Sequence, residues 1–293
     1  MSHIDFLKET VHKDFSFLLD KVSKNRFDNE ILMLKKSLYI NNLEDHEVVV
    51  ELARIVSLFQ YGHTNLNFGT LEYRDLFGFK GASFKVQYYS DGIFISEASK
   101  EHEELLGAKL MAVEGVPIDH VLACIRPICP NENEQYFRQN APNLIRYPQI
   151  LHTVGITEDL QDKITLTVSK NGNTYSQSIE ISSAEKKSEW VTLIEKMDNV
   201  PLYLSGNDKN YFSKYLQSDK TLYIKQIGQQ DEPNGKNIKA FYEEVYQFIE
   251  DNDVEKLVLD VRYNGGGNGY LNQPIVTGAV KSRINKKGAF FVI

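Results

Sequence analysis

The sequence predicts a protein of the α/β class, with α and β structure combined over several domains (α+β overall), for three reasons. Residues 1–77 show a helical spacing of apolar residues, and residues 78–182 contain short strand-like runs separated by turns. Residues 183–293 alternate strand-like and helix-like segments, as parallel sheets with helical crossovers do. We therefore expect three domains with these boundaries.

The first region, residues 1–77, predicts an N-terminal helical bundle. Its apolar residues recur three and four positions apart, as on one face of an α-helix. Three such series are Phe15, Leu18, Leu19 and Val22, then Ile31, Leu34 and Leu38, then Val48, Leu52, Ile55 and Leu58.

The second region, residues 78–182, predicts a β-rich domain. The expected strands cover residues 83–89, 93–97, 108–113, 163–169 and 174–181. The turns Asp91-Gly92 and Asn171-Gly172 separate two pairs of these strands. A helix is expected over residues 118–125, and residues 130–155 show no clear period.

The third region, residues 183–293, predicts a β-α-β-α-β unit. Strands are expected at 221–227, 257–261 and 290–293, and helices at 236–250 and 270–283. The run of apolar residues 257–259 has no polar alternation, as in a parallel strand that helices cover on both faces. A three-stranded sheet that ends on this last strand leaves an apolar edge unpaired, so we expect the unit to be incomplete at its C-terminus.

Composition excludes some classes of partner. A net charge of −7 and a pI near 5.6 argue against binding to nucleic acid, which requires a basic surface. No run approaches the ~20 apolar residues of a membrane span. Without a secretory signal we expect a cytoplasmic protein, the alternative being an exported one whose signal peptide precedes residue 1. Cys124 and Cys129 match no zinc pattern, so we expect no metal and no cofactor.

Gly265, Gly266 and Gly267 follow the strand at 257–261 and precede an expected helix. Glycine allows positive φ and a close approach of ligand atoms to main-chain N–H groups. At a helix N-terminus such groups are suited to bind a developing oxyanion. The simpler interpretation is a tight turn without a ligand. A dinucleotide fingerprint is excluded, because it would need glycine where Tyr270 stands.

The string Asp260-Val261-Arg262-Tyr263-Asn264-Gly265-Gly266-Gly267 resembles the strand and glycine turn of the C-terminal-processing (tail-specific) and tricorn-type serine peptidases, of the Clp-protease/crotonase superfamily. Residues 105–118 resemble the core of a PDZ-type domain. In the tricorn-like branch the general-base histidine lies ahead of that domain, in a Gly-His-Thr-like string that residues 62–64 match.

The resemblance implies a serine endopeptidase that acts on a peptide or protein substrate by acyl transfer. It implies His63 as the general base, Gly266 and Gly267 as the oxyanion hole, and Tyr263 and Asn264 as substrate-binding residues. We interpret Asp260 and Arg262 as an ion pair that supports the turn. The PDZ-like region is expected either to bind a peptide strand or to serve as a scaffold with no open groove.

The nucleophile is not in the chain, since none of the serines present has a recognisable nucleophile context. The 293-residue chain is therefore expected to be an inactive fragment, truncated before the catalytic serine. A Ser/Lys mechanism, as in the tail-specific branch, stays open beside Ser/His. The alternative function is a non-catalytic peptide-binding or regulatory protein on the same scaffold. An acyl-CoA enzyme of crotonase type ranks last.

Overall fold

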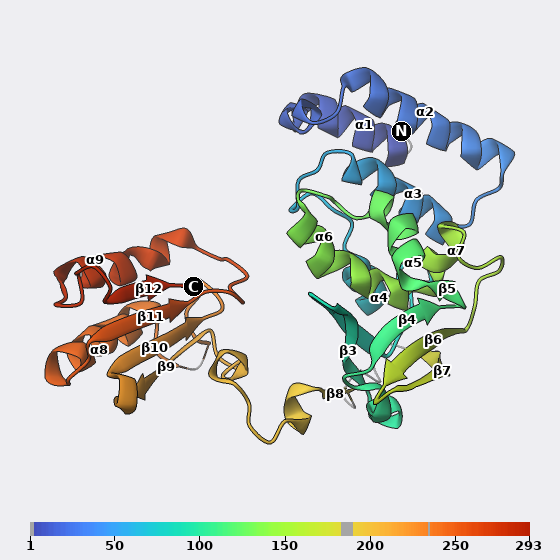
Figure 1. The fold of residues 1–293 in the computed structure, drawn as a ribbon. Helices are drawn as coiled ribbons and strands as arrows, with labels where there is room; N and C mark the ends of the chain where they lie inside the picture. The colour runs from blue at the N-terminus through green and yellow to red at the C-terminus, as the bar shows by residue number, and fades with distance from the viewer. Residues whose placement is uncertain (1–2, 183–189, 234) are drawn as a thin grey trace. The chain divides into compact units, whose positions relative to one another are not determined.

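Residues 3–182, 190–233 and 235–293 are described by a computed structural model, in which helices and strands are mixed as predicted. The chain divides into a unit that reaches to Lys196 and a second unit from Met197 to Ile293 (Figure 1). We call them unit 1 and unit 2. Each has its own hydrophobic core, and each is described by itself.

The predicted N-terminal helices are present in unit 1. Phe27, Ile31 and Phe59 are fully buried where these helices meet. α3 has two buried sides, because Ile55 packs into this helical core and Val50 into the core beneath the β-sheet. The elements are α1 (His3–Lys13), η1 (Ser16–Asp20), α2 (Lys24–Ile40), α3 (Asp45–Ser57) and α4 (Phe68–Tyr73).

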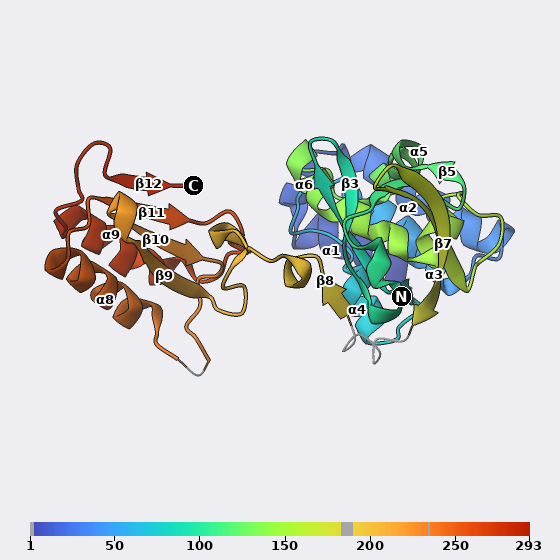
Figure 2. The ribbon, with the colours of Figure 1, turned by 60° about the horizontal axis from the view of Figure 1, so that its bottom comes forward.

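The predicted β-rich region forms an antiparallel sheet, whose path runs β1-β7-β6-β4-β3-β2, with β5 on β4 and β8 on β3. Figure 2 shows how strongly the long strands of this sheet curve. The bounds are β1 (Gly81–Ala82), β2 (Phe84–Tyr89), β3 (Gly92–Ser99), β4 (Lys109–Val113), β5 (Val116–Pro117), β6 (Lys163–Lys170), β7 (Asn173–Ser182) and β8 (Trp190–Thr192).

Short helices fill the stretch in which the sequence shows no clear period. They pack on the sheet, and η4 lies against β2, whose Val86 N–H donates to Asn143 Oδ1 at 3.0 Å. η4 thus covers the edge strand β2 of the sheet. Within this stretch the elements are α6 (Glu134–Asn140), η4 (Ala141–Arg146) and α7 (Pro148–Thr153). The other short helices of unit 1 are η2 (Lys100–Leu105), the predicted α5 (Ile118–Ile125), η3 (Arg126–Ile128) and η6 (Ile194–Lys196).

In unit 2 the sheet order is β12-β11-β10-β9, and the predicted parallel pairing of β10, β11 and β12 is present. The prediction missed β9, which pairs antiparallel with β10 across a tight turn at Lys220. The bounds are η7 (Leu202–Leu204), β9 (Tyr211–Leu216), η8 (Gln217–Asp219), β10 (Thr221–Gln226), α8 (Ile238–Asp251), β11 (Lys256–Asp260), η9 (Gly269–Asn272), α9 (Gln273–Lys281) and β12 (Phe290–Val292).

The two faces of this small sheet differ, which corrects the expectation of helices on both. α8 and α9 pack together on one face, where Ile224 and Leu257 are buried (Figures 1 and 2). The other face buries polar side chains, among them Lys225 and Asp260. The segment before β9 covers it there, since Lys225 Nζ donates to Ser205 O at 2.9 Å.

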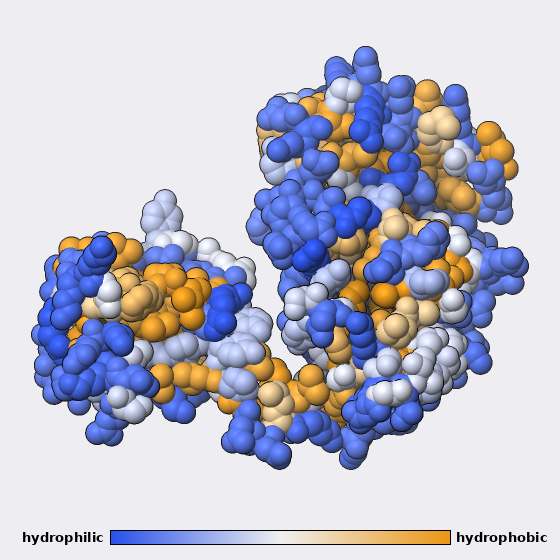
Figure 3. Space-filling model, in the orientation of Figure 1, coloured by the Kyte–Doolittle hydropathy of each residue, from blue (hydrophilic) through white to orange (hydrophobic). Residues whose placement is uncertain are grey.

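An apolar groove of about 420 Å³ opens between α9, β11 and β12. Val276 and Val280 on α9 and Val292 on β12 line it, and each is more than half exposed. Figure 3 shows hydrophobic residues gathered on this side of unit 2. The groove lies beside the carboxyl ends of the parallel strands, where ligands bind in many α/β sheets.

The division into units falls later in the chain than the predicted boundary between residues 182 and 183. Trp190–Thr192 pairs with β3, and this pairing keeps the segment up to Lys196 in unit 1. The predicted boundary at residues 77 and 78 lies inside unit 1, and it stays a prediction. Within the described ranges, no helix is both long enough and apolar enough to cross a membrane.

α3 and α7 meet at two histidines in unit 1. His46 Nε2 lies 3.3 Å from His152 Nδ1, and the side chain of His46 is buried. Burial lowers the pKa of His46 below its usual 6.5, and the nearby His152 lowers it further. The carboxylates of Glu47, Glu44 and Asp45 act in the opposite direction without cancelling the shift.

We predict that unit 1 loses stability as the pH falls through the titration of His46. With a depressed native pKa, the unfolded chain binds the proton first, so the free energy of unfolding begins to fall as the pH drops through the ordinary histidine pKa of 6.5 and keeps falling until the native His46 is itself protonated. Urea unfolding followed by the fluorescence of Trp190, the only tryptophan, measures this change. His46→Gln removes the group and should flatten the dependence. An unchanged dependence in that variant would contradict the assignment to His46.

Candidate functional site

The glycine turn, residues 264–268, follows β11 and is hydrogen-bonded to the segment that follows β10. Gly265 N–H donates to Ile227 O at 2.9 Å, and Gln229 N–H donates to Gly266 O at 2.9 Å. Asn268 N–H donates to Gln229 O at 3.0 Å. The turn is therefore held by main-chain bonds at the carboxyl ends of two parallel strands.

The side chain of Asn264 fixes the shape of the turn from inside. Its Nδ2 donates to Gln226 O at 3.0 Å, and its Oδ1 accepts the N–H of Gly266 at 2.8 Å. Both ends of this amide are thus used within the protein. The N–H of Gly266, a predicted oxyanion donor, is bonded to Asn264 Oδ1 in this structure. The oxyanion role of Gly266 and the substrate-binding role of Asn264 stay predictions.

Gly267 is the predicted oxyanion residue whose amide is available. Its N–H donates to no acceptor among the residues that the structure describes, and the residue is exposed. Its φ of +136° lies where L-residues are strained, and a Cβ would lie 2.5 Å from Gln229 O. Only glycine fits, so this position presents a free N–H without a side chain.

We predict a graded response to alanine along the turn. Gly265→Ala should be nearly neutral, because a Cβ there meets nothing closer than 3.9 Å. Gly266→Ala, with open space but a φ of +92°, should cost about 1 kcal/mol. Gly267→Ala adds a main-chain clash and should cost about 2–3 kcal/mol. Urea unfolding of unit 2 measures the series, and equal effects at the three positions would contradict this geometry.

Asp260 anchors the strand end that leads into the turn. Its buried carboxylate accepts the hydroxyl of Tyr223 at 2.6 Å and Nη2 of Arg262 at 2.6 Å. Burial alone would raise the pKa of Asp260, but the hydrogen bonds from Arg262 and Tyr223 lower it to about 2. The predicted ion pair of Asp260 and Arg262 is confirmed.

Tyr263 and Lys225 lie on the same polar face. The ammonium of Lys225 is 5.0 Å from the centre of the Tyr263 ring, which is 44% exposed. Lys225 also donates to Ser205 O and to Asn207 Oδ1, and burial lowers its pKa. Tyr263, predicted to bind substrate, therefore forms part of the cover over Lys225 and keeps an exposed side.

We predict that Asp260→Asn destabilises unit 2 by about 3 kcal/mol, because the substitution leaves Arg262 and Tyr223 without their carboxylate. Tyr223→Phe removes a single hydrogen bond and should cost about 1 kcal/mol. Chemical denaturation of the two variants against the natural protein tests this ranking. If Tyr223→Phe proved the costlier change, Asp260 would not be the centre of the cluster.

His63 lies in unit 1, on an exposed turn between α3 and α4. The turn is well held, because Gly62 N–H donates to Glu132 Oε2 at 2.8 Å and Tyr136 OH donates to Gly62 O at 2.7 Å. The glycine turn belongs to unit 2. The role of His63 as a general base therefore stays a prediction.

Other chemistry finds little support around the turn. No serine occurs between Ser218 and Ser282, so neither the turn nor the strand before it carries one. Among the described residues, no three His, Cys, Asp or Glu side chains are grouped to hold a metal ion. The N–H of Gly267 can bind an oxygen that carries negative charge.

Sequence reasoning missed two contributions to the site. Lys225 was overlooked, although a lysine inside the otherwise apolar run of β10 is the signal that marks it. Gln229 was overlooked as well. Its main chain is hydrogen-bonded to Gly266 and Asn268, the two residues that flank Gly267. No sequence pattern indicates that second role.

Comparison with known proteins finds only loose likenesses. No protein-family model and no curated protein matches the chain. Among solved structures, a photosystem II D1 C-terminal processing protease is 11% identical, with a TM-score of 0.29, and the match covers 94% of this chain and 64% of that one. A putative S41 protease from Bacteroides fragilis is 14% identical, with a TM-score of 0.22, and the match covers 67% and 43%.

The chain thus spans less than two thirds of the length of both of these proteases. Neither likeness bears on the arrangement of residues at the glycine turn.

Proposed function

We propose that unit 2 is part of the core of a serine-type peptidase, in which Gly267 N–H binds the oxyanion of the tetrahedral intermediate. The observation that carries this proposal is that, among the described residues, Gly267 N–H has no acceptor while the other amides of the turn are bonded. A donor fixed in advance stabilises developing charge without having to reorganise during the reaction. The strand-end position and the adjoining apolar groove favour a ligand at this place.

The implied reaction is acyl transfer. A serine oxygen attacks the peptide carbonyl carbon while its proton passes to a base, and the C–N bond then breaks as that proton moves to the leaving amine. Water releases the acyl group in a second step of the same kind. We assign the base to His63, with a lysine as the alternative of the tail-specific type.

We place the serine in sequence outside residues 1–293. Residues 1–293 then supply the oxyanion donor and its supports, and they do not hydrolyse peptides alone. The rival function is a peptide-binding protein on the same scaffold. The lack of a recognisable nucleophile in these residues favours it.

We predict that a fluorophosphonate, which labels activated serines, leaves residues 1–293 unlabelled. It should label one serine beyond residue 293 in the protein isolated from its natural source, where an intact mass above 33.6 kDa is expected. Gly267→Ala in that longer protein keeps the N–H, but its Cβ would lie 2.5 Å from Gln229 O, so the main chain must move and carry the N–H out of place. Labelling should slow by up to about a hundredfold, as when an oxyanion donor is lost. Gly265→Ala is the matched control.

A natural protein of 33.6 kDa without a labelled serine would exclude catalysis and favour the peptide-binding function. Labelling that Gly267→Ala leaves unchanged would exclude the oxyanion role of Gly267.

A further inference from the structure

Unit 1 contains a cavity of about 520 Å³ that none of the roles described so far uses. α4, β2, α6 and η4 surround it, and its volume is within the ordinary range for ligand sites. Four asparagines line it, and we call it the amide pocket. They are Asn65, Asn67, Asn140 and Asn143.

Two of these asparagines offer hydrogen-bond donors to the pocket. Asn67 Oδ1 accepts Thr70 N–H at 3.0 Å and caps α4, and Asn143 Oδ1 accepts Val86 N–H at 3.0 Å. The oxygens are therefore committed to the fold. The NH₂ groups of both side chains have no acceptor among the described residues.

The other two asparagines offer acceptors. Asn65 Nδ2 donates to Gly62 O at 2.6 Å, and Asn140 Nδ2 donates to Tyr136 O at 2.8 Å. Here the nitrogens are committed, and the side-chain oxygens have no donor in the described ranges. Each side chain is thus held at one end, and the other end is available to a ligand.

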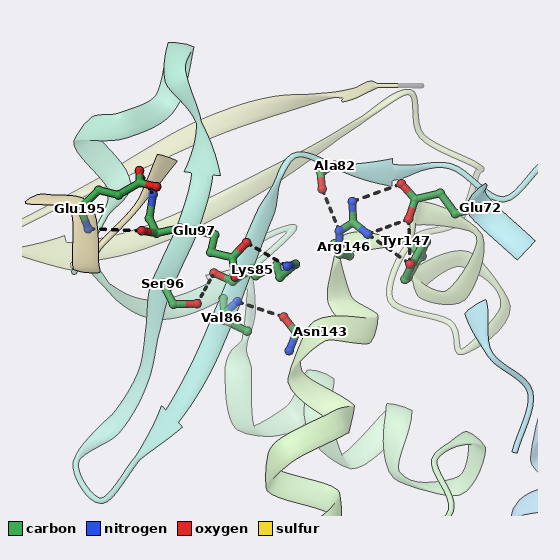
Figure 4. Close-up of polar contacts among 11 residues, drawn as sticks. Glu72, Ala82, Lys85, Val86, Ser96, Glu97, Asn143, Arg146, Tyr147 and Glu195 are labelled. Atoms are coloured by element: carbon green, nitrogen blue, oxygen red, sulfur yellow. Dashed lines mark hydrogen bonds and ion pairs between the residues drawn. The ribbon is translucent and has the colours of Figure 1, made fainter. Parts of the chain in front are cut away.

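The charges in the amide pocket are neutralised by the protein itself, as Figure 4 shows. The buried Arg146 pairs with Glu72 at 2.7 Å, and Lys85 pairs with Glu97 at 2.8 Å. The pocket therefore keeps no unpaired cation, among its described residues, that would favour a free carboxylate. An uncharged ligand suits it better.

The pocket also restricts how a ligand can bind. A peptide cannot add as a strand at Val86, because Asn143 of η4 already takes that N–H (Figure 4). The rings of Phe68 and Tyr147 are buried, so neither offers an open face on which a sugar or a base could stack. Tyr136, the third aromatic residue of the lining, is half-buried, and its hydroxyl donates to Gly62 O. Recognition by the side-chain amides remains, and peptide groups carry both the acceptors and the donors that they need.

We propose that the amide pocket binds an uncharged internal segment of a peptide. The NH₂ groups of Asn67 and Asn143 donate to main-chain carbonyls, and the oxygens of Asn65 and Asn140 accept main-chain N–H groups. Apolar side chains of the peptide contact Leu66 on the pocket wall. This second peptide site stands on unit 1 alone, and it does not depend on catalysis at the glycine turn.

Asparagine-to-aspartate variants test the proposal sharply. Asn67→Asp and Asn143→Asp keep the oxygen that caps α4 or binds Val86 N–H, but each loses the NH₂ donor. A library of short peptides, acetylated and amidated at their ends, is screened for binding, and the best binder is titrated calorimetrically. Each variant should weaken binding about five- to twentyfold. Asn173→Asp, an exposed residue in β7 with the same change in charge, should stay within about twofold.

Several outcomes would overturn the proposal. These are the absence of any binder in the library, binders that require a free C-terminal carboxylate, capture of oligosaccharides in place of peptides, or variants that bind like the natural protein. If an aspartate variant failed to fold, NMR of the natural protein would decide, since the NH₂ signals of Asn67 and Asn143 should shift with the ligand. Gly267→Ala should leave this binding unchanged, so failure here is distinct from failure at the glycine turn.

Discussion

The amide of Asn264 is the interaction on which the candidate site depends. It joins the end of β10 to the middle of the glycine turn, because one end donates to Gln226 O and the other accepts Gly266 N–H. With Gly266 thus engaged, the exposed N–H of Gly267 is the donor that can meet a ligand. The turn is fixed before any ligand arrives, which is what electrostatic catalysis requires.

The buried polar face of the sheet in unit 2 holds the strand ends from which the glycine turn begins. Asp260, the last residue of β11, accepts hydrogen bonds from Tyr223 and Arg262. Lys225 on β10 donates to Ser205 O and so binds the segment before β9 to the sheet. Buried charges of this kind are costly to break and contribute little stability in themselves. Their effect here is to fix where two strands end, and so where the turn begins.

The sequence predicts most elements of the fold, because apolar periodicity and turn residues decide them locally. The parallel order of β10, β11 and β12 and the ion pair of Asp260 with Arg262 are confirmed. β9 was missed, because its mixture of polar and aromatic residues does not mark a strand by itself. The strand is defined by its pairing with β10. Which glycine amide is free depends on the side chain of Asn264 and on the distant Gln229, and no local pattern encodes either contact. The role of His63 as a general base stays a prediction, because His63 lies in unit 1 and the glycine turn in unit 2.

Hydrogen exchange at the three glycine amides, measured by NMR on residues 1–293, tests the central claim most directly. The account predicts slowed exchange at Gly265 and Gly266, whose N–H groups are bonded to Ile227 O and Asn264 Oδ1, and fast exchange at Gly267. In Asn264→Ala the protection of Gly266 should be lost. Protection of Gly267 in the ligand-free protein would contradict the account, because its N–H would already have a partner.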